Sequence, residues 1–251
     1  MFNKYLISIN RAFRFFIEFF KQAFVPPFHF SEIIHQCYEI GLRSLSLITL
    51  TGFITGIVFT KQSRPSLQDF GATSWLPSLI GIAIIRALGP LVTALICAGK
   101  VGSGIGAELG SMKVTEQIDA MEVSAINPFK YLIVTRVAAT TISIPILAFY
   151  CIAVGLLGSY LNVHVEESTS FVSFIKNAFS SINFIDLFTS VVKSVTFGFT
   201  IGIVSCYKGF HAAKGTWGVG QAANHAVIVS MFLIFLEEMI IVQISNWIRM
   251  S

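Results

Sequence analysis

The sequence predicts an all-α integral membrane protein, with an interfacial amphipathic helix at the N-terminus, five transmembrane helices and a short charged helix outside the membrane. Hydrophobic side chains make up 54% of the 251 residues and only 12% are charged, which is too apolar for an ordinary soluble domain. Several apolar runs exceed the roughly 20 residues with which a helix crosses a bilayer. The residue alternation of a membrane β-barrel is absent. We therefore expect helical spans.

The first 25 residues have the pattern of an amphipathic helix. Apolar side chains recur at helical spacing, and charges recur every few residues on the other side, which also argues against a cleaved signal peptide. Such a helix lies in the membrane surface, and Pro26 and Pro27 end it. The apolar stripe consists of Phe2, Leu6, Ile9, Phe13, Phe16, Phe20 and Phe24.

Five apolar stretches follow and form a transmembrane core over 42–247, within a single domain over 1–251. We place the spans at about 42–61, 77–111, 128–158, 184–206 and 222–247. With the N-terminus inside, the inner segments 1–43, 99–130 and 207–214 hold ten Lys and Arg residues, and the outer segments hold four. The positive-inside rule therefore predicts a cytoplasmic N-terminus and a periplasmic C-terminus.

The stretch "GSMKVTEQIDAMEV" (Gly110 to Val123), between the second and third spans, carries four charges. At the bilayer centre these would cost roughly 10 kcal/mol, which the aliphatic side chains would offset by only about 2 kcal/mol. The stretch therefore lies outside the hydrocarbon. Helical spacing of apolar residues predicts a short amphipathic helix over 113–124, and a solvated loop is the alternative. The apolar positions are Val114, Ile118, Met121 and Ala125.

The span that leads into this stretch carries a small residue at every fourth position. Such a ridge lets another helix approach closely in a membrane. Glycines tolerated singly in lipid would not explain an unbroken series. The ridge consists of Ala94, Ala98, Gly102, Gly106 and Gly110.

The charged residues Arg86, Lys193, Glu237 and Glu238 lie well inside the predicted spans. Intramembrane charges are functional candidates by default. The structural alternative is that Lys193 pairs with a carboxylate of the last span, which the predicted depth of both groups allows.

No motif for catalysis, metal binding or nucleotide binding accompanies these features. The glycines of "GSGIGAELG" have the spacing GxGxG, without the surrounding βαβ unit of a dinucleotide site. The four cysteines are far apart, so we expect neither a metal site nor a disulfide. The scattered basic residues do not suggest nucleic-acid binding. We expect no enzymatic chemistry and no cofactor in this chain.

Two longer stretches carry a resemblance to a known family. "RALGPLVTALICAGKVGSGIGAELGSMKVTEQIDAMEVSAINPFKYLIVTRVAA" (Arg86 to Ala139) closely resembles the signature region of the MlaE (YrbE) family of ABC-transporter permeases. "CYKGFHAAKGTWGVGQAANHAVIVS" (Cys206 to Ser230) resembles the second segment of that family. The chain departs from the family at Ala87, where members usually carry Glu after the arginine of "R-E-x-G-P", and at His225, where Arg is common.

The resemblance implies a permease that works as a homodimer in the bacterial inner membrane. Two copies of a cytoplasmic ABC ATPase would bind ATP and Mg, a hexamer of an MCE-domain protein would lie on the periplasmic side, and the cargo would be phospholipid or a related lipid. Arg86, Ala87 and the buried charges Lys193, Glu237 and Glu238 would then lie near the lipid path.

By the same resemblance, the charged stretch would be the cytoplasmic coupling helix, seated in a groove of the ATPase. Its stripe of Val114, Ile118 and Met121 would fill the groove, and Glu116 and Asp119 would make the main polar contacts. The full set of expected coupling residues is Lys113, Glu116, Gln117, Asp119, Met121 and Glu122.

Two other functions remain as alternatives. A stand-alone secondary carrier could use Glu237, Glu238 or Lys193 as proton sites. A non-transporting scaffold subunit of a membrane complex is the second alternative. Dependence of transport on an ATPase, on a proton gradient or on neither would distinguish the three.

Overall fold

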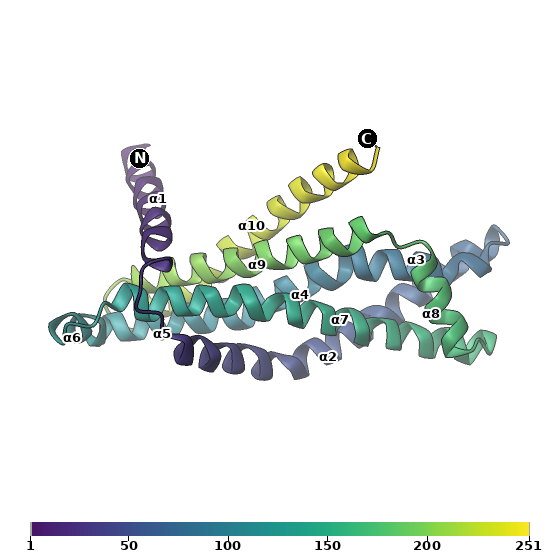
Figure 1. Cartoon of the computed structure of the whole chain (residues 1–251), viewed down its shortest axis with the longest axis horizontal. Helices are drawn as coiled ribbons and strands as arrows, with labels where there is room; N and C mark the ends of the chain where they lie inside the picture. Colours follow the sequence, from purple (N-terminus) through teal and green to yellow (C-terminus); the bar gives the residue numbers. More distant parts are fainter. Residues whose placement is uncertain (1, 251) are drawn as a thin grey trace. The chain divides into compact units, whose positions relative to one another are not determined.

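A computed structural model describes the backbone of residues 2–250 and the side chains of residues 10–249. Residues 2–250 form helices joined by short turns, without a β-strand (Figure 1). Segment η1 is a 3₁₀ turn, and η2, η3 and η4 are π-helical turns. The elements are α1 (Phe2–Ala23), α2 (Phe30–Asp69), η1 (Thr73–Trp75), α3 (Leu76–Ala83), η2 (Ile84–Leu88), α4 (Gly89–Cys97), η3 (Ala98–Gly102), α5 (Ser103–Val114), α6 (Gln117–Val123), η4 (Phe129–Val134), α7 (Thr135–Glu167), α8 (Phe171–Ser180), α9 (Phe184–Phe210) and α10 (Thr216–Met250).

Five helical segments are long and apolar enough to cross a membrane, as predicted, so the chain is an all-α membrane protein. Each segment extends beyond its predicted apolar run, because helix geometry continues into the polar ends that hydropathy does not report. The segments are Phe30–Asp69, Thr73–Val114, Phe129–Glu167, Phe184–Phe210 and Thr216–Arg249.

The chain divides into two compact units. Unit 1 contains Met1–Ile40, Cys97–Ser143 and Gly198–Leu233, and unit 2 contains Gly41–Ile96, Ile144–Phe197 and Ile234–Ser251. The long helices α2, α7, α9 and α10 each contribute residues to both units.

In unit 1, α1 is apolar on two faces rather than one. Phe15 and Phe19 are buried, and the Phe15 ring lies 5.0 Å from that of Phe129 and 5.3 Å from that of Tyr207. The predicted stripe points elsewhere: Phe13, Phe16, Phe20 and Phe24 are exposed, which suits a helix that contacts lipid. The side chains of Phe2, Leu6 and Ile9 lie outside the described residues.

His211 completes the surface on which α1 packs. Its ring lies 5.8 Å from that of Phe15 and 4.6 Å from that of Tyr207, whose carbonyl oxygen is 3.0 Å from Nδ1. Burial lowers the pKa of His211 below 6.5, against the opposing effect of the Tyr207 carbonyl. The nearby charges of Arg11, Lys113 and Lys208 lower the pKa further. The fold therefore favours the neutral form of His211.

The glycines of the small-residue ridge pack against α9, α10 and the turn between them. A Cβ added to Gly102 would lie 3.0 Å from Ser205 Oγ, and one added to Gly106 would lie 3.2 Å from the Cα of Ala223. A Cβ on Gly110 would lie 3.3 Å from that of Ala212. Ala94, which belongs to unit 2, and Ala98 are fully buried. The close packing follows from the absence of side chains at these positions.

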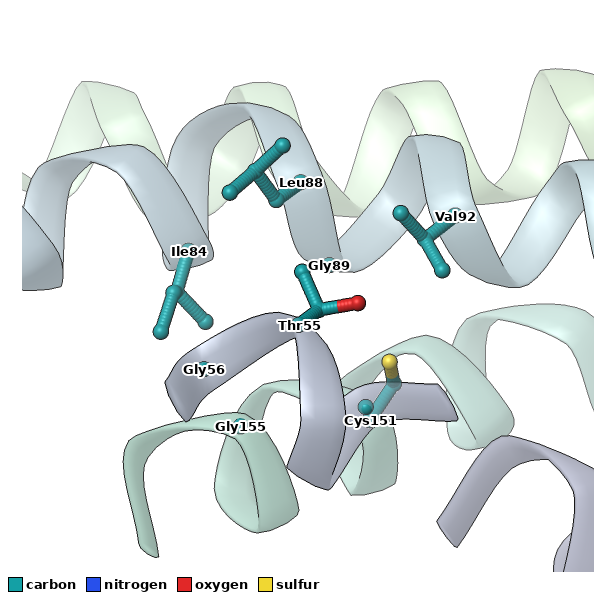
Figure 2. A pocket seen from close by; sticks show the side chains of 9 residues that line it. Thr55, Gly56, Ile84, Leu88, Gly89, Val92, Cys151 and Gly155 are labelled. Carbon is teal, nitrogen blue, oxygen red and sulfur yellow. The ribbon is translucent and has the colours of Figure 1, made fainter. Parts of the chain in front are cut away.

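Unit 2 contains a still closer approach, between α2 and α7. A Cβ on Gly56 would overlap the carbonyl oxygen of Gly155, and Ser159 Oγ donates to the Gly56 carbonyl over 3.0 Å. Between these helices and η2–α4 lies a cavity of about 10 Å³, lined by Ile84, Val92 and Cys151 among others (Figure 2). This volume holds at most one water, so the cavity is not a lipid site.

The sequence analysis missed α8, which packs on α3 in unit 2 (Figure 1). Ser78 Oγ donates to the Asn177 carbonyl over 2.8 Å, and a Cβ on Gly81 would overlap the Ala178 carbonyl oxygen. Ser170 caps α8 by accepting from the Ser173 backbone N–H. This capping serine before an apolar run was the available signal.

We predict that Gly106→Leu lowers the free energy of unfolding by about 1–3 kcal/mol, because the added side chain overpacks the contact with Ala223 and Ala226. Thermal unfolding in detergent measures the change. Gly104→Leu is the control, since a Cβ at this exposed glycine of the same helix meets nothing within 4 Å. Equal stability of the two variants would contradict the role of the ridge.

A second prediction concerns His211. The pKa of His211 is near 6.5 in the unfolded chain and lower in the folded chain. The contribution of His211 to the free energy of unfolding is therefore fully present above pH 6.5 and declines as the pH falls below that value. The loss of thermal stability between pH 7.5 and 5.5 should be smaller in His211→Gln than in the wild type. His35→Gln, at an exposed position of unit 1, should retain the wild-type slope. Equal slopes in all three proteins would refute this account.

Candidate functional sites: a buried ionic network and an exposed charged segment

Arg86 lies in the π turn η2 and joins the side chains of two other helices in unit 2. Its Nη2 donates to Asn246 Oδ1 of α10, and its Nε lies 3.8 Å from Asp186 Oδ1 of α9. Arg249 forms an ion pair with the same carboxylate. The backbone N–H of Asn183 donates to Asp186 Oδ2 over 3.1 Å, so both carboxylate oxygens are engaged at the start of α9.

Lys193 is 0% exposed, and its Nζ lies 2.5 Å from Glu238 Oε1. The structure thus brings Lys193 together with a carboxylate of the last span, as the structural alternative in the sequence analysis expected. Nζ also donates to the Arg86 carbonyl over 3.1 Å. A π turn interrupts the regular helical bonding, which makes its carbonyls available to an outside donor.

We call these six residues the ionic network: Arg86, Asp186, Lys193, Glu238, Asn246 and Arg249. Their contacts connect η2, α9 and α10 through both a side chain and a backbone carbonyl of Arg86. Ala87 and Glu237 are half-buried beside Arg86 and Glu238 in the chain.

The sequence analysis missed Asp186, Asn246 and Arg249. Arg249 was assigned to an outer segment, but α10 continues to Met250 and carries it to Asp186. The available signal was that Asp186, Asn246 and Arg249 all lie close to the outer ends of the fourth and fifth predicted spans.

A second intramembrane ion pair, in unit 1, was also missed. Arg136 of α7 is buried, and its Nη2 lies 2.7 Å from Glu108 Oε1 of α5. Its Nη1 donates to the Leu132 carbonyl over 3.0 Å. An arginine deep within the predicted third span was the signal for this pair.

The charged segment, residues 113–123, belongs to unit 1 and is not one helix. Helix α5 runs to Val114, Glu116 takes the left-handed conformation with φ 59°, and α6 begins at Gln117. The predicted helix over 113–124 is therefore corrected to Gln117–Val123. Thr115 Oγ1 donates back to the Ser111 carbonyl over 2.9 Å, and Lys113 Nζ lies 2.7 Å from Asp119 Oδ1 across the turn.

The apolar side of α6 faces its own chain. Ile118 is 1% exposed, and Val114 and Met121 are half-buried. The expectation that these three fill a groove of a partner is wrong for Ile118, because periodicity defines a face but not what covers it. The exposed residues of the charged segment are Thr115, Glu116, Gln117, Asp119, Ala120, Glu122 and Val123, the last 90% exposed. The charged side chains on this outward surface are thus all acidic.

Residues 33–244 match the family model described as Permease MlaE. A probable ABC transporter permease protein of Rickettsia typhi is 36% identical over 219 residues, which are 87% of this chain and 85% of the relative. A similarly described protein of Synechocystis is 33% identical over 208 residues, covering 82% of this chain and 78% of the relative. One from Porphyra purpurea is 33% identical over 229 residues, 90% and 86% of the two chains.

We predict that Lys193→Met lowers the free energy of unfolding by about 3–5 kcal/mol, because it leaves the Glu238 carboxylate buried without its cation. Adding Glu238→Gln should recover part of this loss, as a double-mutant cycle in detergent would measure. Lys176→Met, at an exposed position of unit 2, should change stability by no more than about 0.5 kcal/mol. Strictly additive losses for Lys193 and Glu238 would argue against a coupled pair.

Proposed function

This chain belongs to the MlaE permease family, and from that premise we propose that it is the membrane subunit of an ATP-driven transporter that moves phospholipid or a related lipid. The match over residues 33–244 carries this proposal. It includes all five spans except a few terminal residues, together with the charged segment. The chain itself is the permease, and ATP and Mg would bind to a separate ATPase subunit.

The outward acidic surface of α6 supports docking of the ATPase at this position. Glu116, Asp119 and Glu122 are exposed beside the strongly exposed Val123. A partner groove with basic residues and a small apolar pocket would complement this surface. Lys113 partly neutralises Asp119, so Glu116 and Glu122 are the better candidates for contact.

The ionic network supports a lipid with an anionic headgroup as cargo. Arg86 and Arg249 share the single carboxylate of Asp186, which leaves an excess of positive charge at this place in unit 2, and guanidinium groups bind phosphate through paired hydrogen bonds. Half-buried Ala87 offers no carboxylate to repel such a headgroup where family members usually carry Glu.

Further parts of the proposal rest on the family and on the charge distribution. The permease would act as a homodimer in the bacterial inner membrane, with its N-terminus cytoplasmic and its C-terminus periplasmic. A hexamer of an MCE-domain protein would accept or deliver lipid on the periplasmic side. Copurification of an ATPase and an MCE protein with this chain would test these partners.

A proton-coupled carrier is less well supported. Lys193 and Glu238 lie 2.5 Å apart in an ion pair that joins α9 to α10, which fits the structural alternative for these charges. Lipid transport that collapses without ATP but survives removal of the proton gradient would favour the permease over both the carrier and a scaffold.

We predict that Glu116→Lys combined with Glu122→Lys weakens ATPase binding at least tenfold and abolishes lipid transport, while the permease stays folded. Reversing an interfacial charge that has a partner typically costs about 2–5 kcal/mol, and 1.4 kcal/mol is a factor of ten. Both side chains at position 116 carry a Cβ, so the left-handed turn is equally strained in each protein.

Binding of purified ATPase to the permease in nanodiscs measures this effect. Asp69→Lys is the matched control, since it reverses an exposed acid at the end of α2, on the membrane side opposite to α6 in the proposed topology. Unchanged ATPase affinity in the double variant would remove the charged segment from the docking surface.

A further inference from the structure

The turn between α1 and α2 is bound to the segment that follows α6. We call residues 22–32 the elbow and residues 127–131 the exit segment; both belong to unit 1. The two are about a hundred positions apart in the chain, yet side chains of the exit segment contact the elbow at three successive places.

Three polar contacts hold the elbow to the exit segment. Asn127 Nδ2 donates to Gln22 Oε1 over 3.0 Å, at the end of α1. Lys130 Nζ donates to the Val25 carbonyl, in the turn itself. Tyr131 Oη donates to Glu32 Oε2 over 3.2 Å, in the first turn of α2.

The side chains packed around these three hydrogen bonds raise the free energy needed to break them. Lys130 is 8% exposed, so its ammonium group depends on the Val25 carbonyl and on the Phe28 ring, 6.0 Å away. The ring of His29 lies 5.2 Å from that of Tyr131. On the other side of the exit segment, Phe129 packs on Phe15 of α1.

Hydrogen bonds hold the residues that connect α6 to the exit segment. The backbone N–H groups of Ala125 and Ile126 donate to the carbonyls of Glu122 and Met121, both over 3.0 Å, which closes the end of α6. Asn127 Oδ1 then accepts from the Lys130 backbone N–H over 3.2 Å. A displacement of α6 therefore reaches the exit segment through a hydrogen-bonded turn.

We propose that the elbow is a second coupling element, which transmits the movement of α6 to α1 and to the first span. The Tyr131–Glu32 bond is its connection to α2, and Gln36 Nε2 orients the Glu32 carboxylate from the next helical turn over 2.8 Å. Tyr131 and Glu32 are positioning residues that do not contact the ATPase. The inference rests on the proposed function, because it assumes that an ATPase moves α6.

Tyr131→Phe tests the inference, because it deletes one hydroxyl and keeps the ring that packs on His29. In nanodiscs with ATPase, ATPase affinity and the rate of ATP hydrolysis should match the wild type, while lipid moved per ATP hydrolysed should fall at least threefold. A loss of fold alone would lower hydrolysis and transport together and leave their ratio unchanged.

Two further variants sharpen the test. Glu32→Leu removes the acceptor and should reproduce the lowered ratio, whereas Glu32→Gln keeps an acceptor and should retain at least half of it. Tyr150→Phe is the matched control, since its hydroxyl lies 2.7 Å from Thr49 Oγ1 and, like that of Tyr131, joins the third span to the first, but in unit 2.

The outcomes separate the inference from the proposed function. A wild-type ratio in both Tyr131→Phe and Glu32→Leu, in a complex that transports lipid, overturns the elbow inference alone. An equal fall in Tyr150→Phe also overturns it, because the effect would then follow from any lost bond between the first and third spans. If the wild-type chain binds no ATPase, the proposed function fails and the inference falls with it.

Discussion

A charged side chain cannot remain in the hydrocarbon of a membrane without a partner, and the arrangement of unit 2 follows from this requirement. Lys193 is enclosed, and it is satisfied only because α10 brings Glu238 to it and the π turn η2 presents the Arg86 carbonyl. Each of these contacts fixes one helix relative to another. Unit 1 meets the same requirement with Arg136 and Glu108, which join α7 to α5.

Van der Waals contact between closely packed backbones also holds the helices together. The hydrophobic effect does not drive helix association inside a membrane, because lipid tails are as apolar as the side chains. Gly56 lies against Gly155 in unit 2, and Gly106 lies against Ala223 in unit 1. Small residues thus allow the helix backbones to approach closely, and the ion pairs determine which faces of the helices are in contact. Two of the three π turns in the described residues take part in these contacts, since η2 contains Arg86 and η3 contains Gly102.

Features that depend on the local pattern could be predicted from the sequence, and features that depend on tertiary contact could not. Apolar runs were sufficient for the five spans, and the depth of Lys193 was sufficient to expect a carboxylate partner. No periodicity reports that Glu116 takes a left-handed conformation and divides the predicted helix. The burial of Ile118 depends on the rest of unit 1, so its helical face could be predicted but not the surface that this face contacts.

The carboxylate of Asp186, which two arginines share, limits how this part of the protein can change in evolution. Loss of the acid leaves two guanidinium groups without an anion, whereas loss of either arginine leaves the other in place. The three positions are therefore not equivalent under selection. A neutral residue at position 186 therefore fits this part of the protein only together with replacement of both arginines, whereas replacement of one arginine needs no second change at position 186.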